Sequence, residues 1–230
     1  MKISTIMILA AGVGKRMGSY TNNFPKPLIK IKNDTVIEKI IKKVISNNFK
    51  KIIINLFYLK DKIKKKLKNK YKINILFSEE KVLLNTGGGI KNAIKIIDVK
   101  EFFVINSDII LEDRKISCFK RLNNFWDKDK MDALLLLYPV RKLKNKVLGD
   151  FFLEKSGNIY KKKNNPPFIF TGVQILKSSL FSNINKRIFP MQLIYKKLIK
   201  KKRIYGLVHK GKWSHIGTFE SLKQYKKMLE

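Results

Sequence analysis

The chain reads Leu9-Ala10-Ala11-Gly12-Val13-Gly14-Lys15-Arg16-Met17 directly after an apolar run at residues 4–9. The alanines and glycines let the main chain approach a ligand closely, and the backbone N–H groups of such a loop can bind phosphate. Lys15 and Arg16 add cationic donors, and an arginine can hold one phosphate through two N–H groups. The spacing matches neither the dinucleotide pattern G-x-G-x-x-G nor a P-loop. The stretch therefore predicts a phosphate-binding turn after the first strand; a plain glycine turn is the alternative.

Apolar segments of strand length alternate with helical patterns along the chain. Continuous apolar runs lie at residues 4–9, 51–55, 73–77, 102–106 and 132–138, and helical periodicity lies at 36–45, 59–67 and 89–97. Such alternation is typical of a parallel sheet with both faces covered. Segments 150–154, 158–161 and 168–176 predict short antiparallel additions, and helices are expected at 192–200 and 218–228. We therefore expect an α/β, Rossmann-like fold with helices on both faces, in one domain over residues 1–230.

The composition leaves the kind of partner open. The 230 residues carry a formal net charge of +34, which points to nucleic acid or an anionic membrane if it is considered by itself. However, lysine, isoleucine and asparagine are abundant throughout, and the lysines form several separate runs. This pattern favours a solvated surface shaped by an AT-rich genome over a nucleic-acid site. In either case the positive field would steer an anionic substrate toward the protein.

The cysteine count and the hydropathy indicate in which compartment we expect the protein. Cys118 is the only cysteine, so we expect no internal disulfide, a reducing cytoplasmic compartment, and a half-buried helix residue rather than a catalytic thiol. No secretory signal is visible, and no apolar run approaches the roughly 20 residues that a membrane span needs. We therefore expect no membrane partner.

A second motif, Pro25-Lys26-Pro27-Leu28, holds one lysine between two prolines. Each proline fixes its own φ, and Pro27 also pushes Lys26 toward extended backbone. The ammonium is thereby presented at a defined place, which suits a phosphate contact. If the motif stood alone, a rigid loop with a solvent-facing lysine would be the simpler interpretation.

Together the two motifs resemble the signature of the nucleotidyltransferases that make nucleotide sugars, L-A-A-G-x-G-x-R-M followed by P-K-P-L. The resemblance continues over nearly the whole chain, through Asn85-Thr86-Gly87-Gly88-Gly89-Ile90, Asn106-Ser107-Asp108, Gly149-Asp150-Phe151, Phe170-Thr171-Gly172-Val173 and Trp213-Ser214-His215-Ile216-Gly217-Thr218. The Thr-Gly-Gly-Gly-Ile stretch looks like the branch that uridylylates N-acetylmuramate 1-phosphate in peptidoglycan recycling.

The resemblance implies transfer of a nucleoside monophosphate from an NTP to a sugar 1-phosphate, with release of pyrophosphate and with Mg²⁺ as cofactor. UTP and N-acetylmuramate 1-phosphate are the favoured substrates. Another sugar or base, as in mannose-1-phosphate guanylyltransferases, remains an alternative, and so does a catalytically degenerate module that binds nucleotide or nucleic acid. We expect a monomer or a small homo-oligomer, because strong self-repulsion argues against large assemblies.

Matching positions carry the expected roles. Asp108 follows a strand, where ligands bind in open α/β sheets, and carboxylate oxygens suit Mg²⁺. The expected catalytic residues are Arg16 at the β- and γ-phosphates, Lys26 at the α-phosphate and Asp108 at the metal. The expected nucleotide-binding set is Ala10, Ala11, Gly12, Gly14, Lys15, Arg16, Lys26, Lys81, Gly87 and Gly88. The expected sugar-phosphate set is Asn106, Gly149, Asp150, Thr171 and Gly172.

Two positions depart from the family pattern. His215 stands where many members have a second metal-binding aspartate, and a neutral imidazole is a poorer Mg²⁺ ligand than a carboxylate. We expect metal ligation by Asp108 and His215; the alternatives are a metal that relies on Asp108 and phosphate oxygens, or a site that accepts Mn²⁺ or Co²⁺ better than Mg²⁺. Asn85 replaces the acid that usually precedes Thr-Gly-Gly-Gly, which leaves the role of that acid in doubt.

Overall fold

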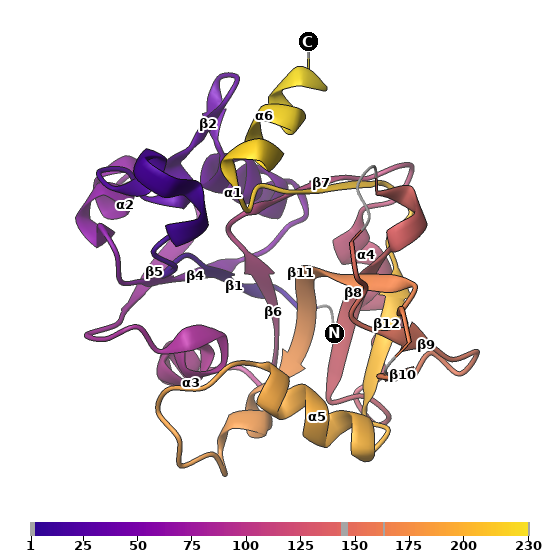
Figure 1. Ribbon diagram of the computed structural model, residues 1–230. Coiled ribbons are helices and arrows are strands. Elements are labelled where there is room, and N and C mark those ends of the chain that lie inside the picture. Colours follow the sequence, from indigo (N-terminus) through magenta and orange to yellow (C-terminus); the bar gives the residue numbers. More distant parts are fainter. Residues whose placement is uncertain (1–2, 144–146, 163, 230) are drawn as a thin grey trace.

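A seven-stranded sheet forms the centre of the computed structural model, which describes residues 3–143, 147–162 and 164–229. Figure 1 shows its strands side by side with helices above and below. In sheet order they are β12 (Ile204–Val208), β8 (Ala133–Pro139), β11 (Phe168–Lys177), β6 (Glu101–Asn106), β1 (Thr5–Leu9), β4 (Lys51–Leu56) and β5 (Asn74–Glu79). The predicted α/β class is confirmed.

Six of the seven strands run in one direction, and β11 runs against them. β1 pairs in parallel with β4 and β6, whereas β11 lies between β6 and β8 and is antiparallel to both. The predicted antiparallel strand at residues 168–176 is confirmed, but it is longer than the short addition expected and lies inside the sheet. This ten-residue strand is central because its apolar side chains, such as Val173 and Leu176, enter the core on both faces.

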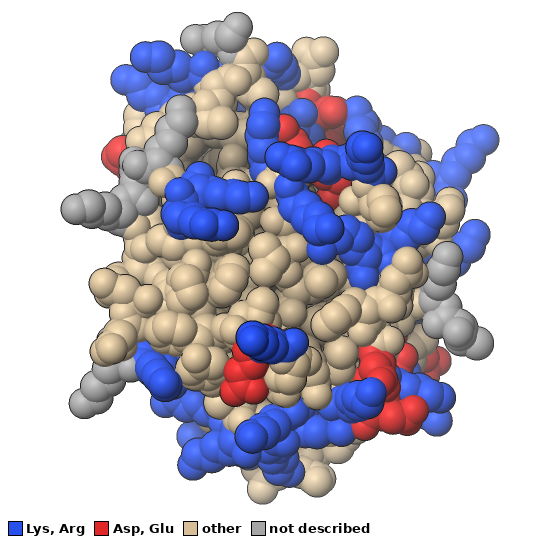
Figure 2. All heavy atoms as spheres, turned by 90° about the vertical axis from the view of Figure 1, so that its right-hand side faces the viewer, with Lys and Arg blue, Asp and Glu red and all other residues tan. Residues whose placement is uncertain are grey.

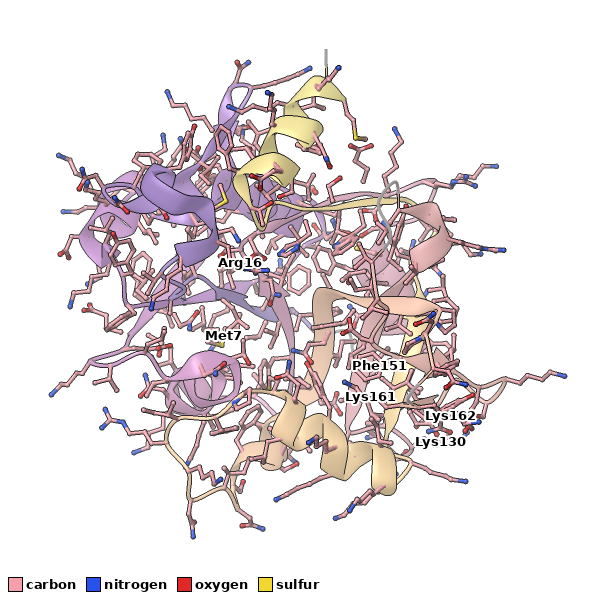
Figure 3. The ribbon with its side chains drawn as sticks, in the orientation of Figure 1. Met7, Arg16, Lys130, Phe151, Lys161 and Lys162 are labelled. Carbon is pink, nitrogen blue, oxygen red and sulfur yellow. The ribbon has the colours of Figure 1, made fainter. Side chains whose placement is uncertain are left out.

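Alternating side chains bind the helices to the two faces of the sheet. In β1, Ile6 and Ile8 join the core on one face and Met7 joins the core on the other, as Figure 3 shows for Met7 below the sheet beside α3. The first face is covered by α1 (Val36–Ser46), α2 (Lys60–Leu67), α4 (Cys118–Phe125) and α6 (Phe219–Lys227), and the second by α3 (Asn85–Ile97) and α5 (Gln192–Lys200).

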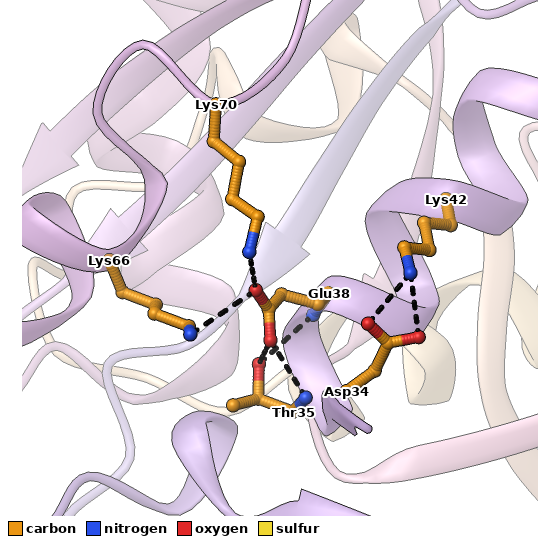
Figure 4. A network of polar contacts seen from close by, with 6 residues as sticks. All are labelled: Asp34, Thr35, Glu38, Lys42, Lys66 and Lys70. Atoms are coloured by element: carbon orange, nitrogen blue, oxygen red, sulfur yellow. Dashed lines mark hydrogen bonds and ion pairs between the residues drawn. The ribbon is translucent and has the colours of Figure 1, made fainter. Parts of the chain in front are cut away.

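Helix α1 begins at a fully formed capping box. The Thr35 side chain accepts the N–H of Glu38, and the Glu38 carboxylate accepts the backbone N–H of Thr35 at 2.8 Å. Figure 4 shows that Glu38 also contacts Lys66, in the last turn of α2, and Lys70, shortly after α2 ends. The Glu38 side chain is only 2% exposed, so this buried carboxylate ties α1 to the lysine-rich α2 segment.

Short elements complete the chain around the sheet. They are the 3₁₀ turns η1 (Lys15–Thr21), η2 (Lys26–Leu28), η3 (Val140–Lys142) and η4 (Ser178–Phe181), and the antiparallel pairs β2 (Lys30–Ile31) with β3 (Asp34–Thr35), β7 (Ile109–Glu112) with β13 (Lys212–His215), and β9 (Phe152–Leu153) with β10 (Ile159–Tyr160). The β9–β10 pair confirms the predicted antiparallel addition, although each strand is shorter than expected.

Two local predictions need correction. Helix α3 begins at Asn85 rather than at Gly89, because Gly87 and Gly88 are helical residues whose missing side chains let α3 pack against Phe189 and the carbonyl of Arg187. Cys118 is buried at 1% exposure rather than half-buried, because it opens α4 against the core, and burial raises the pKa of its thiol.

The surface carries its positive charge in several groups. Figure 2 shows lysine and arginine side chains gathered in separate areas of one face, with a broad uncharged band between them. Within the part of the chain that the structure describes, no helix is both long enough and apolar enough to cross a membrane.

Candidate active site

A cleft of about 400 Å³ lies at the carboxyl ends of β1, β4 and β6. Parallel strands place their ends at one edge of a sheet, and ligands of open α/β folds bind at that edge. The residues lining the cleft are Leu9, Ala11, Gly12, Gly14, Lys15, Arg16, Lys26, Pro27, Asn55, Glu80, Leu83, Asn85, Thr86, Asn106, Ser107, Asp108 and Gly217. The structure thus brings all three expected catalytic residues, Arg16, Lys26 and Asp108, to one cleft.

The loop after β1 forms one wall of this cleft. Its turn depends on Gly14, whose φ of +76° lies in the left-handed region, and the N–H of Met17 donates to the Gly14 carbonyl at 2.8 Å. A Cβ at Gly12 would meet nothing within 4 Å, so Gly12 borders open space. Arg16 is exposed in η1 and lies near the central strands in Figure 3. Small residues and a cation therefore face the cleft together.

Lys26 is held inward by the turn η2. Pro25 precedes this turn in extended backbone, Pro27 lies within it, and Lys26 is 8% exposed. Its Nζ donates to Asp108 Oδ2 at 2.7 Å and to the Gly217 carbonyl at 3.4 Å. The alternative of a solvent-facing lysine does not apply, because the prolines direct this ammonium into the site.

His215 contacts the same oxygen of Asp108 as Lys26 does. Antiparallel pairing of β13 with β7 places His215 opposite Ile109, and its Nε2 donates to Asp108 Oδ2 at 3.2 Å. The imidazole stacks on Trp213, whose ring centroid lies 6.2 Å away at an interplanar angle of 7°. Burial raises the pKa of Asp108, but the hydrogen bond from His215 and the charge of Lys26 outweigh it, so that the pKa lies far below its usual range. Asp108 is therefore an anion throughout the physiological range.

The residues expected at the sugar phosphate divide between two places. Asn106 lines the cleft, and Gly172, with φ of +91°, lets β11 approach its side chain, since a Cβ there would lie 2.9 Å from Asn106 Nδ2. Thr171 is buried beside them, donating through Oγ1 to the Leu136 carbonyl while its own carbonyl accepts the Trp213 indole N–H. Asp150 instead accepts the N–H of Phe170 at 2.9 Å.

Gly149 lies in a second cavity on the same edge of the sheet. This cavity has a volume of about 1000 Å³ and is lined by Pro139, Val140, Arg141, Leu143, Val147, Leu148, Gly149, Asn165, Pro166, Pro167, Phe168 and Val208. Most of these side chains are apolar, and Arg141 carries a positive charge among the lining residues that the structure describes. Figure 3 shows nearby Phe151 with Lys161, whose ammonium lies 5.0 Å from the ring centroid.

Several expected nucleotide residues do not face the cleft in the described structure. The N–H groups of Gly87 and Gly88 both donate to the Phe189 carbonyl, at 2.9 and 3.0 Å. Lys81 is exposed and does not line the cleft, and Ala10 lies buried beneath it. A direct nucleotide contact by Lys81, Gly87 or Gly88 stays a prediction, while the packing of α3 already accounts for both glycines.

Two more residues line the floor of the cleft: Asn55, which the sequence did not indicate, and Glu80, which the sequence could not place. Asn55 ends the apolar strand β4, and its Oδ1 accepts the N–H of Ala10 at 2.8 Å. Glu80 follows β5 and accepts from Asn55 Nδ2 at 2.7 Å. A polar residue directly after three isoleucines is the signal that could have identified Asn55; Glu80 offered no comparable pattern.

Comparison with known proteins identifies the family. The sequence profile of the Nucleotidyl transferase family matches residues 5–230. The N-acetylmuramate alpha-1-phosphate uridylyltransferase of Caulobacter vibrioides is 28% identical over 92% of this chain and 90% of its own length. The enzyme of that name from Neisseria meningitidis serogroup B is also 28% identical, over 95% of each chain.

Structural similarity agrees with the sequence profile. A crystal structure of UDP-glucose pyrophosphorylase complexed with UDP-glucose superposes with a TM-score of 0.84 at 17% identity, over 99% of this chain and 98% of that one, and so shares the fold. With the profile match over almost the whole sequence and the clustering of Arg16, Lys26 and Asp108, this chain belongs to the Nucleotidyl transferase family.

Proposed function

We propose that this chain transfers UMP from UTP to N-acetylmuramate 1-phosphate and releases pyrophosphate. The observation that carries the chemistry is the convergence of Lys26 and Asp108 in a cleft walled by the small-residue loop after β1. The choice of uridylyl group and sugar rests on the two relatives named above, which cover nearly the whole chain.

The loop after β1 is suited to the triphosphate. Gly12 borders open space, so phosphate oxygens can approach the backbone without a side chain in between. Lys15 and Arg16 line the same wall and supply positive charge for the β- and γ-phosphates. Binding at this wall would place the α-phosphorus toward Lys26 and Asp108.

The carboxylate of Asp108 suits a divalent cation. Oδ2 accepts from both Lys26 and His215, whereas Oδ1 accepts no hydrogen bond from any residue in the described ranges. An anionic oxygen in a phosphate-binding cleft suits Mg²⁺, and Asp108 with His215 would hold it there. When bound, the ion would neutralise charge on the phosphates as they react.

The reaction needs little acid–base chemistry from the protein. A sugar 1-phosphate carries a charge of about −2 near neutral pH and is already nucleophilic. One of its phosphate oxygens would attack the α-phosphorus of UTP, and the bond from that phosphorus to the bridging oxygen of the β-phosphate would break. Pyrophosphate leaves with that oxygen. Lys26 would hold charge on the α-phosphoryl group, and Arg16 would hold charge on the leaving pyrophosphate.

The larger cavity supports a substituted acceptor. An unmodified hexose presents mainly hydroxyl groups, which apolar walls cannot satisfy. N-acetylmuramate carries an acetyl methyl group and a lactyl group with a methyl and a carboxylate. The apolar walls beside Gly149 suit those methyl groups, and Arg141 suits the carboxylate.

Pyrophosphate release tests this proposal directly. Four NTPs are crossed with the 1-phosphates of N-acetylmuramate, N-acetylglucosamine, glucose and mannose, with Mg²⁺ and then with Mn²⁺. Turnover confined to UTP and N-acetylmuramate 1-phosphate supports the proposal, and turnover with another pair overturns the assigned specificity. If no pair reacts while DNA or RNA binds with strong salt dependence, the chain is a binding module instead.

A further inference from the structure

A buried chain of three hydrogen bonds crosses the floor of the cleft. The N–H of Ala10 donates to Asn55 Oδ1 at 2.8 Å, Asn55 Nδ2 donates to Glu80 Oε1 at 2.7 Å, and the N–H of Leu84 donates to Glu80 Oε2 at 3.0 Å. Asn55 is 3% exposed and Glu80 is 5% exposed. The geometry is therefore fixed inside the protein and is little affected by solvent.

The two ends of this chain belong to opposite walls of the cleft. Ala10 opens the loop that continues to Arg16, and Leu84 is the residue from which helix α3 begins. Leu83, Asn85 and Thr86, on either side of Leu84, line the same cleft as that loop. Asn55 and Glu80 thus connect two segments that are distant in sequence and both border the nucleotide space.

Gly89 leaves room for this connection. A Cβ at Gly89 would lie 2.7 Å from Glu80 Oε1 and 2.8 Å from Asn55 Nδ2, closer than ordinary packing allows. The third glycine of the glycine run therefore packs directly over the hydrogen bond between Asn55 and Glu80. The need for glycine at position 89 is therefore explained without any nucleotide contact.

The buried Asn55–Glu80 pair would be a costly choice if it served only to fill space in the core. Burial raises the pKa of Glu80, and among the described residues no lysine, arginine or histidine lies within ion-pairing distance of its carboxylate. An apolar pair would fill the same space without this cost, but it would leave the N–H groups of Ala10 and Leu84 without acceptors. The polar pair is thus matched to two backbone donors at the ends of two cleft segments.

We propose that Asn55 and Glu80 are positioning residues for the nucleotidyl transfer. They set the loop after β1 relative to the start of α3, so that the nucleotide is held between two walls of fixed spacing. Neither residue needs to touch the reacting atoms. The inference uses the nucleotidyltransferase activity of the family and is independent of which sugar is the acceptor.

The direction of donors and acceptors provides a sharp test. Asn55 and Leu84 donate to different oxygens of Glu80, so in Glu80→Gln one of these donors meets the amide N–H₂ group instead of an acceptor. In Asn55→Asp, two carboxyl oxygens face each other, because Asp has no N–H₂ to offer Glu80. The double variant Asn55→Asp with Glu80→Gln restores all three hydrogen bonds with the polarity of the central one reversed, at nearly unchanged volume and charge.

The measurements are kcat and KM for the NTP, and binding of a non-hydrolysable NTP analogue with Mg²⁺ by calorimetry. We expect each single variant to lose about five- to hundredfold in kcat/KM for the NTP, since a buried group left unsatisfied costs about 1–3 kcal/mol. The double variant is expected to recover to within about threefold of the original chain, and Asn55→Asp is expected to improve as the pH falls and the two carboxyl groups share a proton.

Thermal unfolding of all four proteins separates positioning from folding. A double variant that remains as impaired as the worse single variant, although it is as stable as the original chain, would overturn the proposal. Single variants with unchanged analogue binding and unchanged kcat/KM would overturn it as well. Analogue binding does not require an acceptor, so the binding measurements test the proposal even if the sugar is not identified, whereas kcat/KM needs an acceptor that reacts.

Discussion

Lys26 Nζ lies 2.7 Å from Asp108 Oδ2, although the two residues are 82 positions apart in the chain. An ammonium has three N–H donors, and the Gly217 carbonyl takes a second one at 3.4 Å. One donor is left for the cleft. Lys26 can therefore hold the Asp108 carboxylate in place and contact a phosphate at the same time.

Removing either partner is expected to abolish most turnover. For Lys26→Met and Asp108→Asn we predict a fall in kcat of about 100- to 1000-fold, because each removes a charge placed at the reacting phosphates. Circular dichroism and thermal unfolding should show that both variants fold. Lys30→Met is the matched control, because Lys30 is exposed and begins β2, two residues after η2. Near-normal kcat in either test variant would contradict the assignment.

The metal dependence should respond to His215. Replacing it by aspartate adds a carboxylate beside Asp108, and Mg²⁺ prefers oxygen ligands. We predict that His215→Asp lowers the Mg²⁺ concentration needed for half-maximal turnover. An Mg²⁺ titration of activity, alongside the original chain and repeated with Mn²⁺, measures this. Identical titrations for the two proteins would show that the position does not act on the metal.

Two glycines should respond to alanine in opposite ways. Gly12→Ala is expected to keep the unfolding temperature and to raise KM for the NTP about tenfold or more, because its Cβ enters the space left for phosphate. Gly87→Ala is expected to cost about 1–3 kcal/mol of folding free energy, because its Cβ would collide with Phe189. Unfolding curves and NTP kinetics of both variants check this. Equal losses of stability in the two variants would contradict the assignment of Gly12 to phosphate binding and Gly87 to packing.

Acid sensitivity should depend on Glu38. Burial raises its pKa, but the hydrogen bonds from Lys70 and Thr35 outweigh burial and lower the pKa from 4.5 to about 2. Because the folded protein lowers this pKa, the ionised Glu38 stabilises the fold. This stabilisation is complete above about pH 4.5 and is lost as the pH falls toward 2. We predict that Glu38→Gln lowers the free energy of unfolding at pH 7 by about 1–3 kcal/mol and that its deficit shrinks in acid.

Denaturant unfolding between pH 7 and pH 3 measures the Glu38 effect. Asp34→Asn is the control, since Asp34 pairs with the exposed Lys42 and surface pairs contribute little. A deficit of Glu38→Gln that stays constant across this range would rule out the ion-pair explanation.

Acceptor choice should depend on Arg141. We predict that Arg141→Gln lowers kcat/KM for N-acetylmuramate 1-phosphate about tenfold and leaves N-acetylglucosamine 1-phosphate unchanged, because only the former has a carboxylate. Lys142→Gln, next in the same turn, is the control. An equal effect on both acceptors would remove Arg141 from the proposed specificity.

Much of this fold follows from local patterns in the sequence. The apolar runs that became β1, β4 and β6 were identifiable because strands covered on both faces are continuously apolar. The place of β11 was not identifiable, because pairing with β6 and β8 depends on contacts between segments that are distant in sequence. The strand β12 was missed for the same reason, since it pairs in parallel with β8 at the edge of the sheet.

The candidate site could also be predicted only in part from the sequence. The motifs around Arg16, Lys26 and Asp108 indicated its charged residues. Their mutual contacts depend on three loops meeting at one sheet edge, which spacing along the chain does not reveal. The hydrogen bond between Asn55 and Glu80 joins the ends of two strands, so neither residue stands out in a local pattern.

Attack of the acceptor phosphate on the α-phosphorus is the central claim, and oxygen labelling tests it most directly. N-acetylmuramate 1-phosphate labelled with ¹⁸O in its phosphate is incubated with unlabelled UTP, Mg²⁺ and the protein, and the products are separated for mass spectrometry. We predict a UDP-sugar that retains all of the label and pyrophosphate that contains none. Label in pyrophosphate, or the absence of any nucleotide sugar, would contradict it.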